Sequence, residues 1–113
     1  MSTQWIWQQE ISREIFQQKY CLQGETSVEE VFHGVAAEIA STEPDARERT
    51  RWEAAFYDEL IAGRLQPAGR ILANARPNSP MKNYNICFTI EIEDDLEKIY
   101  DSLKEDALIS KMG

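Results

Sequence analysis

The stretch TSVEEVFHGVAAEIAS, residues 26–41, decides the fold because it carries the clearest helical pattern in the chain. Its apolar side chains recur every three or four residues, the spacing that lines one face of an α-helix: Val28, Val31, Phe32, Val35 and Ile39. Thr26 and Glu29 have the spacing of a capping box, which satisfies backbone N–H groups at a helix start. Pro44 disfavours helical geometry in the residue before it, so this helix should end near Ser41.

Helical patterns also flank this segment. Trp5 to Tyr20 has a weaker apolar face, and the helical pattern is then interrupted by Gly24. Ala46 to Ala62 predicts a second long helix, with Gly63 as its C-terminal stop. A last helix should begin at Asp94 or Asp95 and run to the end of the chain, with acidic residues in its first turn and Lys111 in its last, as the helix dipole favours.

Between these helices, residues 65–82 have no apolar period and contain several prolines, which predicts an ordered binding loop. From Tyr84 to Ile92, apolar and polar residues alternate, which predicts a strand. Cys87 lies on the polar side of that alternation. The expected fold class is therefore mainly α with one or two short strands, although no second convincing strand is available to pair with this one.

Composition excludes several function classes. The 113 residues carry a formal net charge of -8 and a pI of about 4.6, which disfavours binding to a nucleic acid polymer. No apolar run is long enough to span a membrane, and the N-terminus lacks a signal-peptide pattern, so we expect a cytoplasmic protein. Two cysteines and one histidine without ligand spacing predict no metal site. The length favours one folded unit with little room for an enclosed active site.

The order of motifs in the second half of the chain resembles the start of the catalytic barrel of ribonucleotide reductase large chains, particularly the adenosylcobalamin-dependent class II type. The matching pieces are a PxGRxL loop at Pro67, Gly69, Arg70 and Leu72; Cys87-Phe88-Thr89; Glu93-Asp94-Asp95-Leu96-Glu97 with Ile99; and Lys111-Met112-Gly113. The upstream text IFQQKYCLQGETSVEEVFHGVA resembles the helical lead-in of the family. The resemblance implies a helical N-terminal region at 1–64, followed at 65–113 by the first strand and helix of a ten-stranded α/β barrel, which this chain leaves incomplete.

The resemblance also implies residue roles. Cys87 corresponds to one of two redox thiols that reduce the ribose, whereas a core cysteine is the structural alternative. Arg70, Ile86 and Cys87 correspond to substrate contacts; Arg70 as an exposed loop charge is the alternative. Asp94, with Asp95 and Leu96, corresponds to the site of a deoxynucleotide effector at a dimer interface; the alternative is that Asp94 caps the following helix, and it could serve as both.

The implied partners are the remainder of the catalytic chain and a ribonucleotide substrate, with adenosylcobalamin bound by the assembled enzyme rather than by this chain alone. The thiyl-radical cysteine and the second redox cysteine of the family have no counterpart here, so the chain is not expected to be catalytically complete. We therefore expect a fragment or split subunit of the reductase. The alternative is a non-catalytic helical interaction module or a truncated remnant of such a chain.

Overall fold

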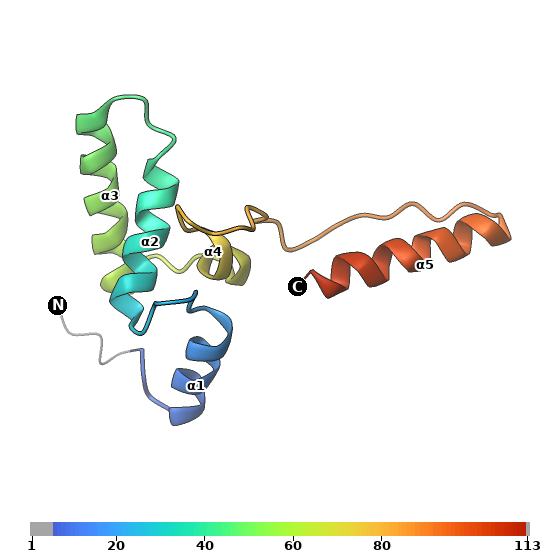
Figure 1. The fold of residues 1–113 in the computed structure, drawn as a ribbon, viewed down its shortest axis with the longest axis horizontal. Coiled ribbons are helices and arrows are strands. Elements are labelled where there is room, and N and C mark those ends of the chain that lie inside the picture. Colours follow the sequence, from blue (N-terminus) through green and yellow to red (C-terminus); the bar gives the residue numbers. More distant parts are fainter. Residues whose placement is uncertain (1–5, 113) are drawn as a thin grey trace.

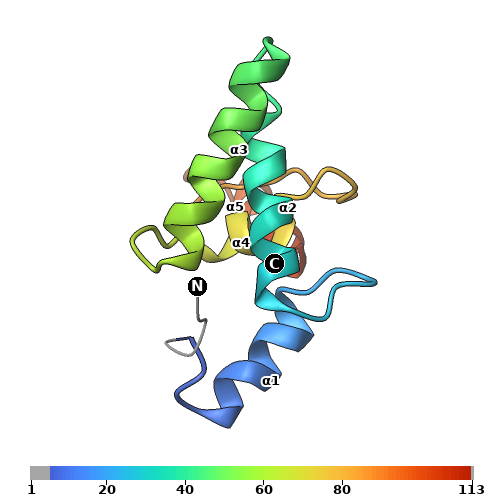
Figure 2. The ribbon, with the colours of Figure 1, turned by 90° about the vertical axis from the view of Figure 1, so that its left-hand side faces the viewer.

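The computed structural model describes residues 6–112, within which five helices and no strand are formed. The helices are α1 (Glu10–Lys19), α2 (Val28–Ala40), α3 (Ala46–Ile61), α4 (Gly69–Asn74) and α5 (Leu96–Lys111). In Figure 1, α2 and α3 form an antiparallel hairpin, with α4 beside α2 and α5 set apart at the end of a long extended segment. Figure 2 shows α1 beyond the end of α2 at which that helix begins.

The core lies between α2, α3 and α4. Four of its buried apolar residues belong to the α2 stripe predicted from the sequence: Val28, Val31, Phe32 and Val35. The others are Leu60 and Ile61 of α3 and Ala75 after α4. Side chains of α1 and of the residues around it, including Trp7, Phe16 and Cys21, pack on this core while remaining partly exposed. Burial of the apolar stripe therefore holds the hairpin together.

The α2 helix begins one residue later than predicted. Ser27 is its N-cap: the Ser27 hydroxyl accepts from the backbone N–H of Glu30, and the Glu30 carboxylate accepts from the backbone N–H of Ser27. The capping box is thus formed by Ser27 and Glu30, and the predicted pair of Thr26 and Glu29 was wrong. The two pairs have equal spacing, so sequence alone did not separate them. Glu30 also accepts from Thr26, and the backbone donors of Thr26 and Ser27 lower the pKa of its carboxyl.

The α3 helix and its ends agree with the prediction. Asp45 caps its start by accepting from the backbone N–H groups of Arg47 and Glu48. Its helical residues end at Ile61, and Gly63 follows with a φ of 70°, a left-handed conformation that a glycine adopts without steric strain. The α1 helix starts at Glu10, later than predicted, and Trp5 lies outside the described residues.

Two predictions for the middle of the chain were wrong. Residues 69–74 form the short helix α4, where a loop was expected, because Ile71 and Leu72 pack against the core. The predicted strand Tyr84–Ile92 is not formed in residues 6–112; it is extended chain that leaves the core. A strand needs a neighbour to satisfy its backbone groups, and no described segment pairs with this one.

The α5 helix was predicted to begin at Asp94 or Asp95, and Asp95 is its cap: the Asp95 carboxylate accepts from the backbone N–H of Lys98, so Asp94 does not have the capping role that was its alternative. None of its residues is buried. With this arm extended, the Cα radius of gyration is 17.7 Å, against about 13 Å for a compact domain of this length. Gly113, the last residue of the predicted motif at the end of α5, lies outside the described residues.

Candidate functional site

A hollow of about 630 Å³ lies where four parts of the chain meet: the end of α1, the helix α4, the extended segment and the end of α5. Its lining comprises Lys19, Tyr20, Gly69, Arg70, Ala73, Asn74, Ile86 and Met112. Two of the predicted substrate residues, Arg70 and Ile86, therefore share one cavity. The third, Cys87, follows Ile86 directly and is an exposed free thiol.

The hollow is lined by two cationic side chains, Lys19 and Arg70. The Arg70 guanidinium carbon lies 5.5 Å from the centre of the Phe88 ring, a cation–π contact that connects α4 to the segment bearing Cys87. Its Nη1 is shielded from solvent and has no hydrogen-bond partner among residues 6–112. An unpaired guanidinium N–H beside a second cation is chemically suited to an anionic oxygen.

The rim of the hollow is fixed by close packing and one hydrogen bond. A Cβ atom placed on Gly69 would lie 3.4 Å from the Tyr20 hydroxyl oxygen, an ordinary van der Waals distance, so Gly69 and Tyr20 are close neighbours at this rim. On the other side, Asn74 Nδ2 donates to the backbone carbonyl of Asn83 at 2.9 Å. These contacts place α4 between α1 and the start of the extended segment.

The two cysteines differ in surroundings. Cys87 is exposed, whereas Cys21 packs partly against the core. Burial raises the pKa of the Cys21 thiol, and the negative charge of Glu25 raises it further. Cys21 is thus expected to form the thiolate less readily than it would as an exposed cysteine.

The predicted effector residues lie at the N-terminal end of α5. Asp95 is occupied as the helix cap, Asp94 is exposed, and Leu96 is 72% exposed. Met112, just past the other end of α5, lines the hollow. A helix of 16 residues is about 24 Å long. The predicted effector residues are therefore separated from the Met112 end of α5, and so from the predicted substrate residues at the hollow, by about the length of this helix.

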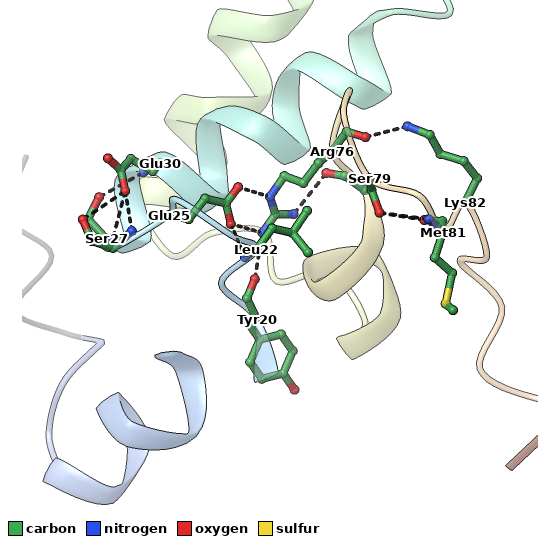
Figure 3. Close-up of polar contacts among 11 residues, drawn as sticks. Tyr20, Leu22, Glu25, Ser27, Glu30, Arg76, Ser79, Met81 and Lys82 are labelled. Atoms are coloured by element: carbon green, nitrogen blue, oxygen red, sulfur yellow. Dashed lines mark hydrogen bonds and ion pairs between the residues drawn. The ribbon is translucent and has the colours of Figure 1, made fainter. Parts of the chain in front are cut away.

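An ion pair not anticipated from the sequence joins Glu25, just before α2, to Arg76, after α4 (Figure 3). Arg76 is 1% exposed, and its Nε donates to Glu25 at 2.8 Å while its Nη2 donates to the Tyr20 carbonyl at 3.1 Å. The close approach needs a glycine on α2: a Cβ on Gly34 would lie 2.4 Å from Arg76 Cδ. Glu25 and Arg76 are 51 positions apart, so no local pattern signals this contact.

A second missed cluster joins α2 to the extended segment. One oxygen of Glu38 accepts from Lys82 Nζ at 2.8 Å and from the Tyr84 hydroxyl at 3.0 Å. The hydrogen bond from Lys82 lowers the pKa of the Glu38 carboxyl, and the hydrogen bond from Tyr84 lowers it by a smaller amount. Burial and the Glu38 contact raise the pKa of the Tyr84 phenol.

Metal-ligating side chains are not grouped within the described residues: no cluster of three or more His, Cys, Asp or Glu between residues 6 and 112 is placed to hold a metal ion. None of the helices described is both long enough and apolar enough to cross a membrane.

Comparison with known proteins adds an independent observation. The family described as "Ribonucleotide reductase, all-alpha domain" matches residues 7–80. The chain is 39% identical over 75 residues to the ribonucleoside-diphosphate reductase subunit alpha of Synechocystis sp., an alignment covering 66% of this chain and 9% of that protein. It is 32% identical over 85 residues to the subunit of the same name from Treponema pallidum, covering 75% of this chain and 10% of that protein. The chain thus spans about a tenth of the length of these curated relatives. No solved structure matches significantly.

Proposed function

Because the chain belongs to the ribonucleotide reductase family and carries its all-alpha domain, we propose that it forms the N-terminal part of a catalytic chain that reduces ribonucleotides to deoxyribonucleotides. The match of the family to residues 7–80 is the observation that carries this proposal. The named activity of the two relatives favours ribonucleoside diphosphates as the substrate class. The division into a helical region at 1–64 and the start of the barrel at 65–113 is part of the same proposal.

Cys87 is the proposed redox residue. With a second thiol from the rest of the catalytic chain, it supplies two electrons and two protons: the ribose C2′–OH bond is replaced by C2′–H, water leaves, and the two sulfurs close to a disulfide. Its exposure next to Ile86, which lines the hollow, supports this role because the thiol must reach both substrate and partner sulfur.

Arg70 and Ile86 are the proposed substrate contacts of this chain. The Arg70 guanidinium and the nearby Lys19 ammonium provide positive charge for phosphate oxygens, and Ile86 provides an apolar wall. Asp94 is proposed to accept hydrogen bonds from the ribose hydroxyls of a deoxynucleotide effector, next to Asp95 and Leu96. Since Asp95 already caps α5, Asp94 is the better placed of the two carboxylates.

The rest of the catalytic chain is the proposed partner of α5 and the extended segment. Large apolar side chains there are solvent-exposed, including Ile86, Phe88, Ile92, Leu96, Ile99, Tyr100 and Leu103. A concentration of exposed apolar surface is typical of an interface. The radical initiator is proposed to be adenosylcobalamin, which supplies the initiating radical when bound by the assembled enzyme. Residues 6–112 contain no cluster of metal-ligating side chains, so the proposal places the cofactor in the rest of that enzyme.

Deoxynucleotide formation by the assembled catalytic chain tests the proposal. The chain, joined to or mixed with the remainder of the catalytic polypeptide, receives a ribonucleoside diphosphate, adenosylcobalamin and a thiol reductant. We expect Cys87→Ser to abolish turnover with thiol reductant and the matched Cys21→Ser control to retain it. Full turnover by Cys87→Ser would refute the redox role.

The same preparation separates the alternative, a non-catalytic interaction module. An assembled complex that contains this chain and binds substrate, yet forms no deoxynucleotide with any radical initiator, would favour the module. Turnover only with a diiron radical subunit would reject the adenosylcobalamin assignment while keeping the reductase.

A further inference from the structure

We propose that Glu38 is a positioning residue that fixes the Cys87 segment against α2 and so sets the place of that thiol relative to the Arg70 hollow. The catalytic meaning of this placement rests on the proposed function of Cys87, whereas the anchoring itself does not. Glu38 lies on α2, inside the region matched by the family, and the residues it binds lie beyond residue 80.

The anchor has a charged centre with two donors. The side chain of Glu38 is only 17% exposed, and one of its oxygens accepts from both Lys82 Nζ and the Tyr84 hydroxyl. Lys82 Nζ also donates to the Arg76 carbonyl at 2.5 Å and the Pro77 carbonyl at 3.4 Å. One carboxylate therefore joins α2, the loop after α4 and the beginning of the extended segment.

The segment beyond this anchor has few other restraints. Residues 85–93 form no helix or strand, so their backbone is not held by a regular ladder. Beside Cys87, the Arg70 guanidinium contacts the Phe88 ring, and the Asn85 N–H donates to the Asn83 side chain. The other described restraints lie toward α5: Ser102 donates to the Glu91 carbonyl, Lys98 pairs with Glu93, and the Asp95 N–H donates to the Glu93 carbonyl. Cys87 is three residues beyond Tyr84, which confines its Cα within about 10 Å of an anchored Tyr84.

Asn74 provides a neighbouring tether through its hydrogen bond to the Asn83 carbonyl. That bond joins two neutral groups, whereas both bonds to Glu38 have an ionised acceptor, and charge-assisted bonds are the stronger class. Of the residues that precede Cys87 and bind a side chain of α2, Tyr84 is the nearest to Cys87 in the sequence. Glu38 is therefore the restraint whose loss should matter most for Cys87.

The test is the mobility of a nitroxide attached to Cys87, measured by electron paramagnetic resonance in a Cys21→Ser background of the full chain. We expect Glu38→Ala to lose the immobile component of the spectrum. Glu59→Ala is the matched control, because Glu59 is also a helix carboxylate paired with a cation, Arg64, but does not bind the segment. An unchanged immobile component in Glu38→Ala, with native circular dichroism, would overturn the proposal.

A double variant provides the test if Glu38→Ala does not fold. Tyr84→Phe combined with Lys82→Met leaves Glu38 in place and removes both donors, and it should lose the same immobile component. A spectrum identical to that of the parent would contradict the anchor. Because no turnover is measured, this result is independent of the Cys87→Ser assay, which can fail while the anchor stands.

Discussion

Glu25→Gln should destabilise the protein strongly, because it leaves the Arg76 guanidinium buried without its counter-ion. Arg76 is 1% exposed and is bonded to Glu25 at 2.8 Å. Removing one partner of a buried ion pair costs about 3–5 kcal/mol, since the remaining charge has no water to solvate it. With a urea m-value of about 1.5 kcal/mol/M, a loss of about 4 kcal/mol lowers the midpoint by roughly 2.5 M.

The assay is urea unfolding followed by far-UV circular dichroism, with Glu59→Gln as control. Glu59 pairs with Arg64 on the surface, where both side chains are about half exposed and solvent screens the pair, so its loss should barely move the midpoint. The double variant Glu25→Gln/Arg76→Met removes both charges and should recover part of the loss. The reasoning is refuted if Glu25→Gln and Glu59→Gln lower the midpoint equally.

Three further measurements test other contacts. Iodoacetamide should alkylate exposed Cys87 faster than Cys21, whose burial raises its pKa, and peptide mass spectrometry would show the reverse order if this is wrong. Because the pKa of Glu38 is lowered on folding, its contribution to stability is present above the usual carboxyl pKa and is lost as pH falls through the lowered value. The urea midpoints of the parent and Glu38→Gln should therefore differ at neutral pH and converge as the pH falls through the lowered pKa of Glu38; a constant difference would contradict the pairing. Gly63→Ala should cost about 1–2 kcal/mol in the same unfolding assay, because Gly63 has a φ of 70°, and no loss would argue against that backbone conformation.

The helices were predictable where local signals suffice. The α2 stripe, the stop at Gly63 and the acidic start of α5 each depend on residues within a few positions of one another. The short α4 was not predictable, because its six residues become helical through packing of Ile71 and Leu72 on the core. Tertiary contact decided that element rather than intrinsic propensity.

The strand prediction failed for the corresponding reason. Alternation from Tyr84 to Ile92 shows that the segment is suited to a sheet, but pairing requires a neighbour, and none is formed in residues 6–112. For the site, the sequence indicated Arg70 and Ile86, which do share a hollow. It gave no indication of Glu38 or Arg76, because their partners are 44 to 51 positions away.

The close approach of Gly34 to Arg76 links the evolution of two distant positions. A Cβ at position 34 would lie 2.4 Å from Arg76 Cδ, so any side chain there collides with the arginine as long as it is present. Homologues with a residue larger than glycine at this position should therefore carry a shorter side chain in place of Arg76. Sequence design on this scaffold would likewise have to change both positions in a single step, since the intermediate with alanine and arginine together is the disfavoured one.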